Sequence, residues 1–107
     1  MISCKINRKD GRISSVNIAG HSGYDIIGYD IVCAAVSALS ITVLNGLTEY
    51  VKADIKYEIK DDGYIDFEIL DTDDKIKALQ IDAIVETFYL GLKSIELNYS
   101  EYIKVQE

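Results

Sequence analysis

The sequence predicts an α+β fold, a two-layer sandwich in which two long helices pack on a mainly antiparallel sheet. Two pairs of alternating apolar and polar segments each meet at an Asp-Gly turn signal, which is typical of β-hairpins. Each pair is followed by a long stretch with apolar residues at helical spacing. A short last strand completes the order ββαββαβ, and this order favours helices gathered on a sheet.

The first hairpin is predicted over residues 2–19. Ile2, Cys4 and Ile6 alternate with polar residues, so one face of the first strand is apolar. Asp10-Gly11 forms the turn, and the second strand covers residues 12–19. Cys4 lies between two isoleucines on the apolar face, and we therefore interpret it as a core residue.

Residues 20–29 are expected to form a mobile loop, because three glycines in ten residues suit neither a helix nor a strand. The following residues, 30–52, are apolar nearly all round. This pattern predicts a helix that is covered on most sides by the sheet and by a second helix or a partner chain. Its most apolar part, residues 31–44, contains hydroxyl side chains and is expected to be too short to span a bilayer.

The second half of the chain repeats the pattern. Residues 55–60 and 65–69 alternate on either side of Asp62-Gly63, which predicts another hairpin. Residues 71–74, which include three aspartates, are expected to cap a helix that runs to about residue 97, since carboxylates stabilise a helix N-terminus. The last strand is predicted over residues 99–105.

Composition and charge limit the class of protein. The 107 residues contain no proline and no linker-like run, so residues 1–107 are expected to form one domain. Lys plus Arg is 11 and Asp plus Glu is 18, and this net charge of −7 argues against binding nucleic acid and fits a basic partner. Without a secretory signal at its start, the chain is expected to be cytoplasmic, with reduced thiols.

Cys33 is the strongest candidate for chemistry. If Asp30 caps the first helix, Cys33 occupies its third position, where unpaired backbone N–H groups and the helix dipole favour a thiolate. The alternative is that Cys33 is a small buried apolar residue. Ser37, four residues later, lies on the same helix face and either orients the site or bonds its own backbone.

His21, the single histidine, lies at the end of the second strand, 12 residues before Cys33. A flexible loop between them would let the imidazole reach the thiol, take its proton and later give it to a leaving amine. A metal site that combines these two residues with Asp25 or Asp30 lacks the paired spacing of known metal sites. No metal and no cofactor are therefore expected.

These residues also carry a resemblance to a known family. Gly20-His21, followed by Gly-Tyr-Asp-Ile-Val-Cys-Ala-Ala-Val-Ser at residues 28–37, closely resembles the ribosomal-processing cysteine proteases of bacteria. The similarity in length and element order covers nearly the whole chain. It implies that His21 is the catalytic histidine and Cys33 the nucleophile, with Asp30 and Ser37 near the site. The family usually has alanine where this chain has Ser22.

The resemblance implies a homodimeric endopeptidase that removes a short N-terminal extension from large-subunit ribosomal protein twenty-seven, a step in ribosome maturation. It also implies a substrate loop that moves on binding and includes Ser22, Gly23, Tyr24, Gly28 and Tyr29. Two other functions stay open from the residues alone. One is a non-catalytic peptide-binding module in ribosome assembly, and the other is a thiol redox sensor at Cys33, which lacks a resolving cysteine nearby in the sequence.

Overall fold

A computed structural model describes residues 1–20, 27–61 and 63–107 of the chain. The predicted order ββαββαβ is confirmed. The elements are β1 (Ile2–Lys9), β2 (Arg12–Ala19), α1 (Ile27–Asn45), one π-helical turn η1 (Gly46–Tyr50), β3 (Ile55–Lys60), β4 (Tyr64–Ile69), α2 (Lys75–Asn98) and β5 (Ile103–Gln106).

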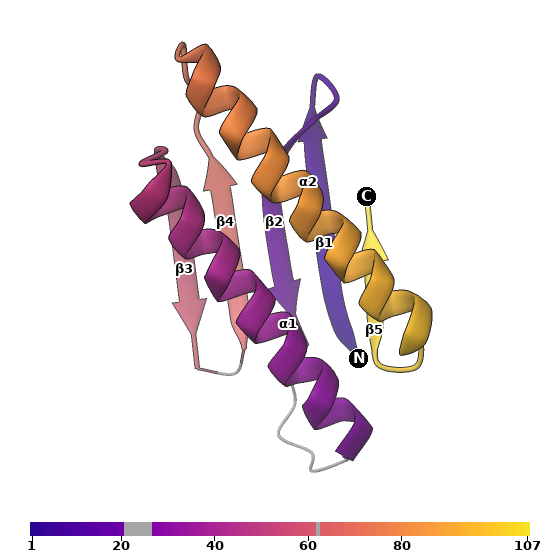
Figure 1. The fold of residues 1–107 in the computed structure, drawn as a ribbon. Helices are drawn as coiled ribbons and strands as arrows, with labels where there is room; N and C mark the ends of the chain where they lie inside the picture. Colours follow the sequence, from indigo (N-terminus) through magenta and orange to yellow (C-terminus); the bar gives the residue numbers. More distant parts are fainter. Residues whose placement is uncertain (21–26, 62) are drawn as a thin grey trace.

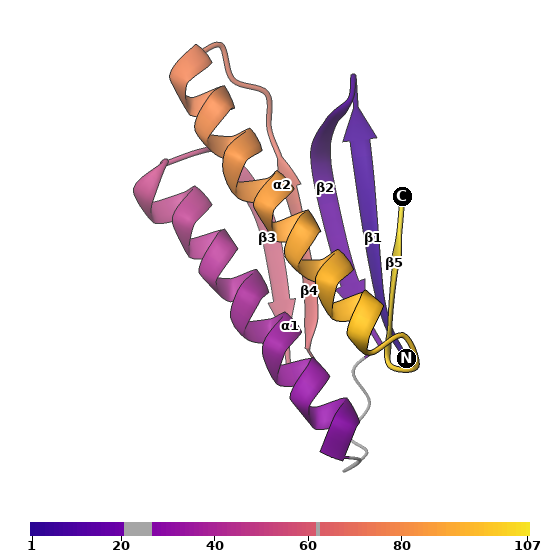
Figure 2. The same cartoon turned by 45° about the vertical axis from the view of Figure 1, so that its right-hand side comes forward.

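The strands form one five-stranded sheet in the order β3-β4-β2-β1-β5. All neighbouring pairs are antiparallel except β1 and β5, which are parallel. Both helices lie on the same face of this sheet, with α1 on the β3 side of α2 (Figures 1 and 2). The predicted α+β sandwich with a mainly antiparallel sheet is therefore confirmed, and the other sheet face is left open.

The core lies between the sheet and the helices. On β1, the predicted apolar face is buried, and Cys4 within it is 0% exposed, which confirms its interpretation as a core residue. Phe67 of β4 and Phe88 of α2 meet in this core with ring centroids 6.2 Å apart. Because alternate strand residues point to one face, the period-two pattern was sufficient to identify these buried positions.

The start of α1 differs from the prediction. The helix begins at Ile27, so Gly28 and Tyr29, which were expected in the loop, lie in its first turn. Asp30 is the fourth helical residue and not the N-cap, and Cys33 is the seventh residue and not the third. A single glycine costs a helix only about 1 kcal/mol relative to alanine, and the packing of a long helix outweighs that cost.

The other helix ends are closer to expectation. Asp74 caps α2, and its carboxylate accepts hydrogen bonds from the backbone N–H groups of Ile76 and Lys77 at 2.9 and 3.1 Å. The first helix ends earlier as an α-helix than predicted and passes into η1, where Val51 N–H donates to the carbonyl of Gly46 at 3.0 Å. The final strand is shorter than predicted because residues 99–102 form a turn.

The helical run Ile31–Tyr50 is, at 20 residues and a mean hydropathy of 1.9, long and apolar enough to cross a membrane, which corrects the shorter estimate from the sequence. Core helices of soluble proteins share this composition. One side of α1 packs on the sheet through Val32, Val36 and Ser40, all buried. Its opposite side, with Ile31 and Ala35, is exposed, so the single chain does not cover α1 on most sides.

Candidate functional site

Cys33 lies in the second turn of α1, half-buried at the border of the core. In a helix that starts at Ile27, the N–H of residue 33 belongs to the regular i to i−4 ladder. The unpaired amides belong to the first turn, roughly 5 to 9 Å away along the axis at about 1.5 Å per residue. Cys33 therefore does not lie at the helix-terminal amides that were expected to stabilise its thiolate.

Cys33 faces away from α2. Leu39 marks the α2 side of the helix, because a Cβ added at Gly91 would lie 3.0 Å from Leu39 Cδ2. At about 100° per residue, Ser37 and Ile41 lie almost opposite Leu39, and Cys33 lies one turn before Ser37. We call Cys33, Ser37 and Ile41 the outer flank of α1; all three are half-buried. Because α1 lies on the β3 side of α2 (Figure 1), a flank that is turned away from α2 belongs to the β3 side of this helix.

Gly20, at the end of β2, sets where the chain leaves the sheet. Its φ of +96° lies in the left-handed region that favours glycine. A Cβ at this position would also collide with the backbone carbonyl of Met1. The sequence motif included Gly20, but this close approach to Met1 had no signal in the sequence. Both the end of β2 and the start of α1 lie at the N-terminal end of β1 (Figures 1 and 2).

The structure describes only some of the other predicted site residues. His21, Ser22, Gly23, Tyr24 and Asp25 lie outside the described residues. Gly28, Tyr29 and Asp30 are described as part of α1. The structure thus places Cys33 and Ser37 on one flank of α1. This part of α1 is next to the end of the sheet where β2 finishes at Ala19, two residues before His21 in the sequence.

Cys4 provides an internal contrast to Cys33. Burial, and secondarily the negative charge of Glu96, raise the pKa of the Cys4 thiol from its ordinary value of 9.0 to about 12. Cys4 is fully buried in β1, whereas Cys33 is partly exposed. The two thiols therefore differ in access: Cys4 is sealed in the core, whereas Cys33 reaches the surface of α1.

This difference predicts selective labelling. At pH 8, iodoacetamide should modify Cys33 of the native protein and leave Cys4 intact, because roughly one Cys4 thiol in 10⁴ is ionised four units below its pKa. The raised pKa of Cys4 also makes the stability of the folded chain depend on pH. The unfolded chain ionises Cys4 near pH 9 and the folded chain near 12, so this contribution is present below pH 9 and is lost as the pH rises to 12. Peptide mapping by mass spectrometry checks the labelling, and equal modification of both cysteines would contradict it.

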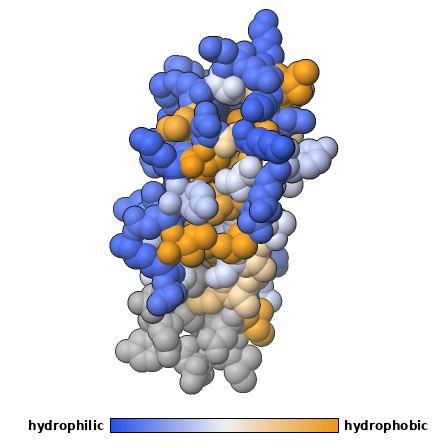
Figure 3. Space-filling view, turned by 90° about the vertical axis from the view of Figure 1, so that its left-hand side faces the viewer, coloured by the Kyte–Doolittle hydropathy of each residue, from blue (hydrophilic) through white to orange (hydrophobic). Residues whose placement is uncertain are grey.

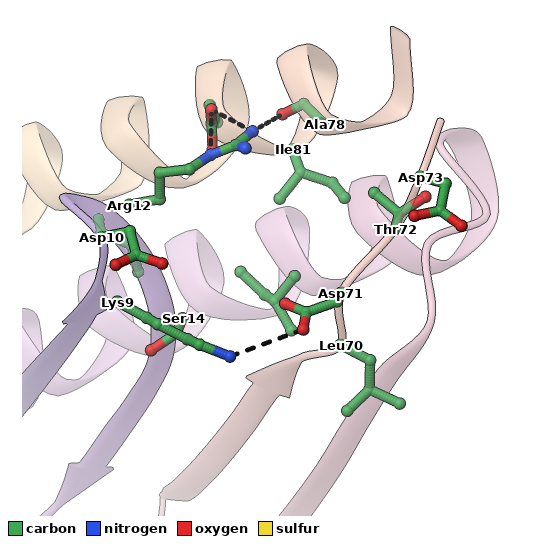
Figure 4. A pocket seen from close by; sticks show the side chains of 13 residues that line it. Lys9, Asp10, Arg12, Ser14, Leu70, Asp71, Thr72, Asp73, Ala78 and Ile81 are labelled. Atoms are coloured by element: carbon green, nitrogen blue, oxygen red, sulfur yellow. Dashed lines mark hydrogen bonds and ion pairs between the residues drawn. The ribbon is translucent and has the colours of Figure 1, made fainter. Parts of the chain in front are cut away.

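A pocket of about 440 Å³ lies at the opposite end of the sheet, between the β1–β2 turn and the start of α2 (Figure 4). Its two cations are already paired with carboxylates of the pocket, Lys9 with Asp71 at 3.6 Å and Arg12 with Asp82 at 2.7 Å. No predicted site residue lines it. Across residues 1–20, 27–61 and 63–107, no group of three His, Cys, Asp or Glu side chains could hold a metal ion.

Comparison with known proteins points to one family. Residues 1–104 match the family model for the cysteine protease Prp. The ribosomal processing cysteine protease Prp of Staphylococcus aureus is 34% identical over 109 residues, which cover 98% of this chain and 97% of that protein. The crystal structure of the S. aureus protease with a substrate peptide has a TM-score of 0.87 at 25% identity, with both chains covered completely. A second S. aureus structure, with a covalently linked product peptide, has a TM-score of 0.83 at 26% identity and the same coverage.

Proposed function

Since the chain belongs to the Prp family of ribosomal processing cysteine proteases, we propose that it is the endopeptidase that removes the short N-terminal extension of large-subunit ribosomal protein twenty-seven. Cys33 is the nucleophile and His21 the proton-transfer residue. The observation that best supports this assignment is the contrast between the two thiols: Cys33 is partly exposed on the outer flank of α1, while Cys4 is sealed in the core. We place the reaction in the cytoplasm, where it would precede ribosome assembly.

The proposed reaction has two steps. His21 takes the proton from Cys33 Sγ, and the thiolate attacks the carbonyl carbon of the scissile peptide bond. When the C–N bond breaks, His21 donates that proton to the leaving amine, and the acyl group stays on Cys33 as a thioester. His21 then removes a proton from water, the hydroxide attacks the thioester, and the carboxylic acid leaves as the thiolate is restored. Because Cys33 lies in the second turn of α1, beyond the free amides of the first turn, the imidazole has the larger share of thiol activation.

The neighbouring residues are assigned supporting roles. Ser37 follows Cys33 by one turn on the outer flank, where its hydroxyl can orient a group beside the sulfur. Asp30 or Asp25 orients His21. Ser22, Gly23 and Tyr24 form the substrate loop, and Gly28 and Tyr29 contribute to it from the first turn of α1. The net charge of −7 favours a basic ribosomal substrate through electrostatic attraction.

A direct assay tests this function. The purified chain is incubated with a synthetic peptide spanning the extension junction of ribosomal protein twenty-seven, and the products are weighed by mass spectrometry. We expect two fragments whose masses add up to the peptide plus one water. An intact peptide that binds wild type and the Cys33→Ala variant equally would reject the protease function and support a non-catalytic binding module.

We also propose that the enzyme is a homodimer that associates through the outer face of its helical layer. On α2, Ile76, Leu90 and Leu97 are spaced by multiples of seven residues along one exposed stripe, and the latter two are 63% and 83% exposed. On α1, residues 31–48 contain no charged side chain. In a chain with 27% charged residues and a net charge of −7, the uncharged part of α1 beside the apolar stripe of α2 is where a second copy can approach with least repulsion.

The dimer proposal predicts the effect of a surface charge. Leu90→Glu should convert the dimer to a monomer at micromolar concentration, because it places a carboxylate in an apolar contact without disturbing the core. Gln106→Glu adds the same charge at an exposed position on β5 and serves as the matched control. Light scattering after size-exclusion chromatography measures both masses. A Leu90→Glu variant with the mass of the wild-type dimer would contradict this interface.

A further inference from the structure

Strand β3 is an open edge of the sheet. It lies at the end of the strand order and pairs only with β4, through all six of its residues and without a bulge. It contains no proline. Natural proteins usually protect such an edge with charged side chains, proline, a bulge or a covering segment, since an exposed edge pairs readily with another extended chain. The charged residues of β3, Lys56, Glu58 and Lys60, all alternate onto the face away from the helices.

The ladder between β3 and β4 shows which backbone groups face outward. Leu70 N–H donates to the carbonyl of Asp54 at 3.0 Å, so these directly opposed residues form a hydrogen-bonded pair. Hydrogen-bonded and non-bonded pairs alternate in an antiparallel ladder. Ile55, Tyr57 and Ile59 therefore direct their N–H and C=O groups away from β4, and no group in the described part of the chain bonds to them.

The opposite edge of the sheet is strand β5, and it is protected. Strand β5 has only four residues, and the outward N–H of its Val105 donates to a carboxylate oxygen of Glu96 at 2.6 Å. This bond, together with Lys93, lowers the pKa of Glu96, so the cap stays ionised at neutral pH. One edge is thus short and capped by a side chain, and the other is longer and uncapped, which suits β3 for strand addition.

The side chains of β3 fit an extended peptide. Tyr57 and Ile59 lie on the face that carries the helices, opposite Phe67 and Ile65 of β4, yet they are 57% and 48% exposed. The outer flank of α1 is turned toward this side, and Cys33 lies in the N-terminal half of the helix, which extends past the end of the sheet at which β3 ends (Figure 1). Figure 3 looks at this side and shows apolar residues along the length of the molecule between polar margins.

We propose that the substrate peptide binds in extended form along β3 as a sixth strand, with its alternate apolar side chains against Tyr57 and Ile59, and that this strand addition directs the scissile bond to the outer flank of α1. Main-chain hydrogen bonds to Ile55, Tyr57 and Ile59 give affinity, and the alternate side chains give selectivity. The proposal rests on the protease function above, because it assigns the partner as that enzyme's substrate.

A second copy of the chain is the main competing occupant. Antiparallel pairing of two β3 strands around Tyr57 would place Lys56 opposite Glu58 of the other copy, which is a favourable pair. We assign the edge to the substrate because the helical layer, with its exposed apolar residues on α2 and the uncharged stretch 31–48 on α1, already offers a surface for dimerisation. An isologous contact at both places would link the copies into an open chain and not into a closed dimer.

Residue-resolved hydrogen exchange tests the proposal. The Cys33→Ala variant is saturated with the junction peptide, and amide exchange is followed by NMR, with binding monitored independently by fluorescence anisotropy. We expect exchange at the amides of Ile55, Tyr57 and Ile59 to slow by up to about tenfold, because each amide gains a hydrogen bond. The amides of Lys56 and Glu58, which already bond to β4, are internal controls and should change less than about twofold.

A backbone variant supplies a second measurement. Tyr57→Pro removes one outward N–H and leaves the ladder to β4 complete, whereas Tyr57→Ala removes only the side chain. Peptide affinity in the Cys33→Ala background should fall about fivefold more for proline than for alanine, since only proline removes a donor.

Each other outcome overturns the proposal. Unchanged exchange at the three outward amides while peptide is bound would place the peptide elsewhere, and an absence of peptide binding would reject the site altogether. Protection that exists without peptide and disappears on dilution would assign the edge to a second copy. Because these readouts need no cleavage, a wild-type enzyme that fails to cut the peptide would reject the protease function separately.

Discussion

The Cys33→Ala variant is expected to cleave the junction peptide about 10⁴-fold more slowly than wild type, or not measurably, because removal of a covalent nucleophile costs about this much in comparable enzymes. The other thiol of the chain, Cys4, is buried in the core and cannot take its place. The measurement is the initial rate of product formation by chromatography and mass.

Two controls separate chemistry from folding in this experiment. Cys4→Ala should keep its rate within about twofold and lose about 1 to 2 kcal/mol of unfolding free energy, because it removes a buried sulfur. Ser37→Ala changes the next residue on the outer flank and should cost less than about tenfold, as expected for an orienting residue. A Cys33→Ala enzyme with more than about one hundredth of the wild-type rate would contradict the assignment.

The His21→Ala variant is expected to lose about 10²- to 10⁴-fold in rate, the usual contribution of general acid–base catalysis. This loss should be larger than a helix-terminal thiolate would show, because Cys33 lies in the second turn of α1, beyond the free amides of the first turn. The variant should also regain activity as the pH rises, since base in solution can then replace the imidazole. Rates at several pH values and alkylation of Cys33 by iodoacetamide measure both effects.

Ser22→Ala is the matched control for the histidine. It changes the adjacent residue to the alanine that the family usually has, so its rate should stay within about threefold of wild type. If His21→Ala and Ser22→Ala had equal rates, His21 would not be the proton-transfer residue.

Local patterns predicted most of the fold. The alternation of Ile2, Cys4 and Ile6 identified both the first strand and its buried face, and the acidic residues before α2 predicted the cap that Asp74 provides. The pairing of β1 with β5 had no such signal, since a parallel contact between the first and last strands depends on the whole fold. The early start of α1 at Ile27 was missed because Gly28 suggested a loop, whereas tertiary packing decides where a long helix begins.

The sequence names the candidate site residues, but it does not show where the fold places them. The run around Cys33 predicts the nucleophile, but this residue lies four positions deeper in α1 than expected, so the proposed activation of the thiol shifts from the helix terminus to the histidine. The need for glycine at position 20 depends on the nearby carbonyl of Met1, a contact between chain segments that a sequence pattern does not contain. The open edge of β3 likewise emerges only from the strand order.

Trapping the acyl-enzyme tests the central assignment most directly. Wild-type protein is mixed with the junction peptide, quenched in acid within the first turnovers, and digested for peptide mapping by mass spectrometry. We predict that the N-terminal fragment is attached as a thioester to the peptide containing Cys33 and that the peptide containing Cys4 is unmodified. Efficient cleavage with no adduct at Cys33, or an adduct at Cys4, would show that the bond is broken by another group.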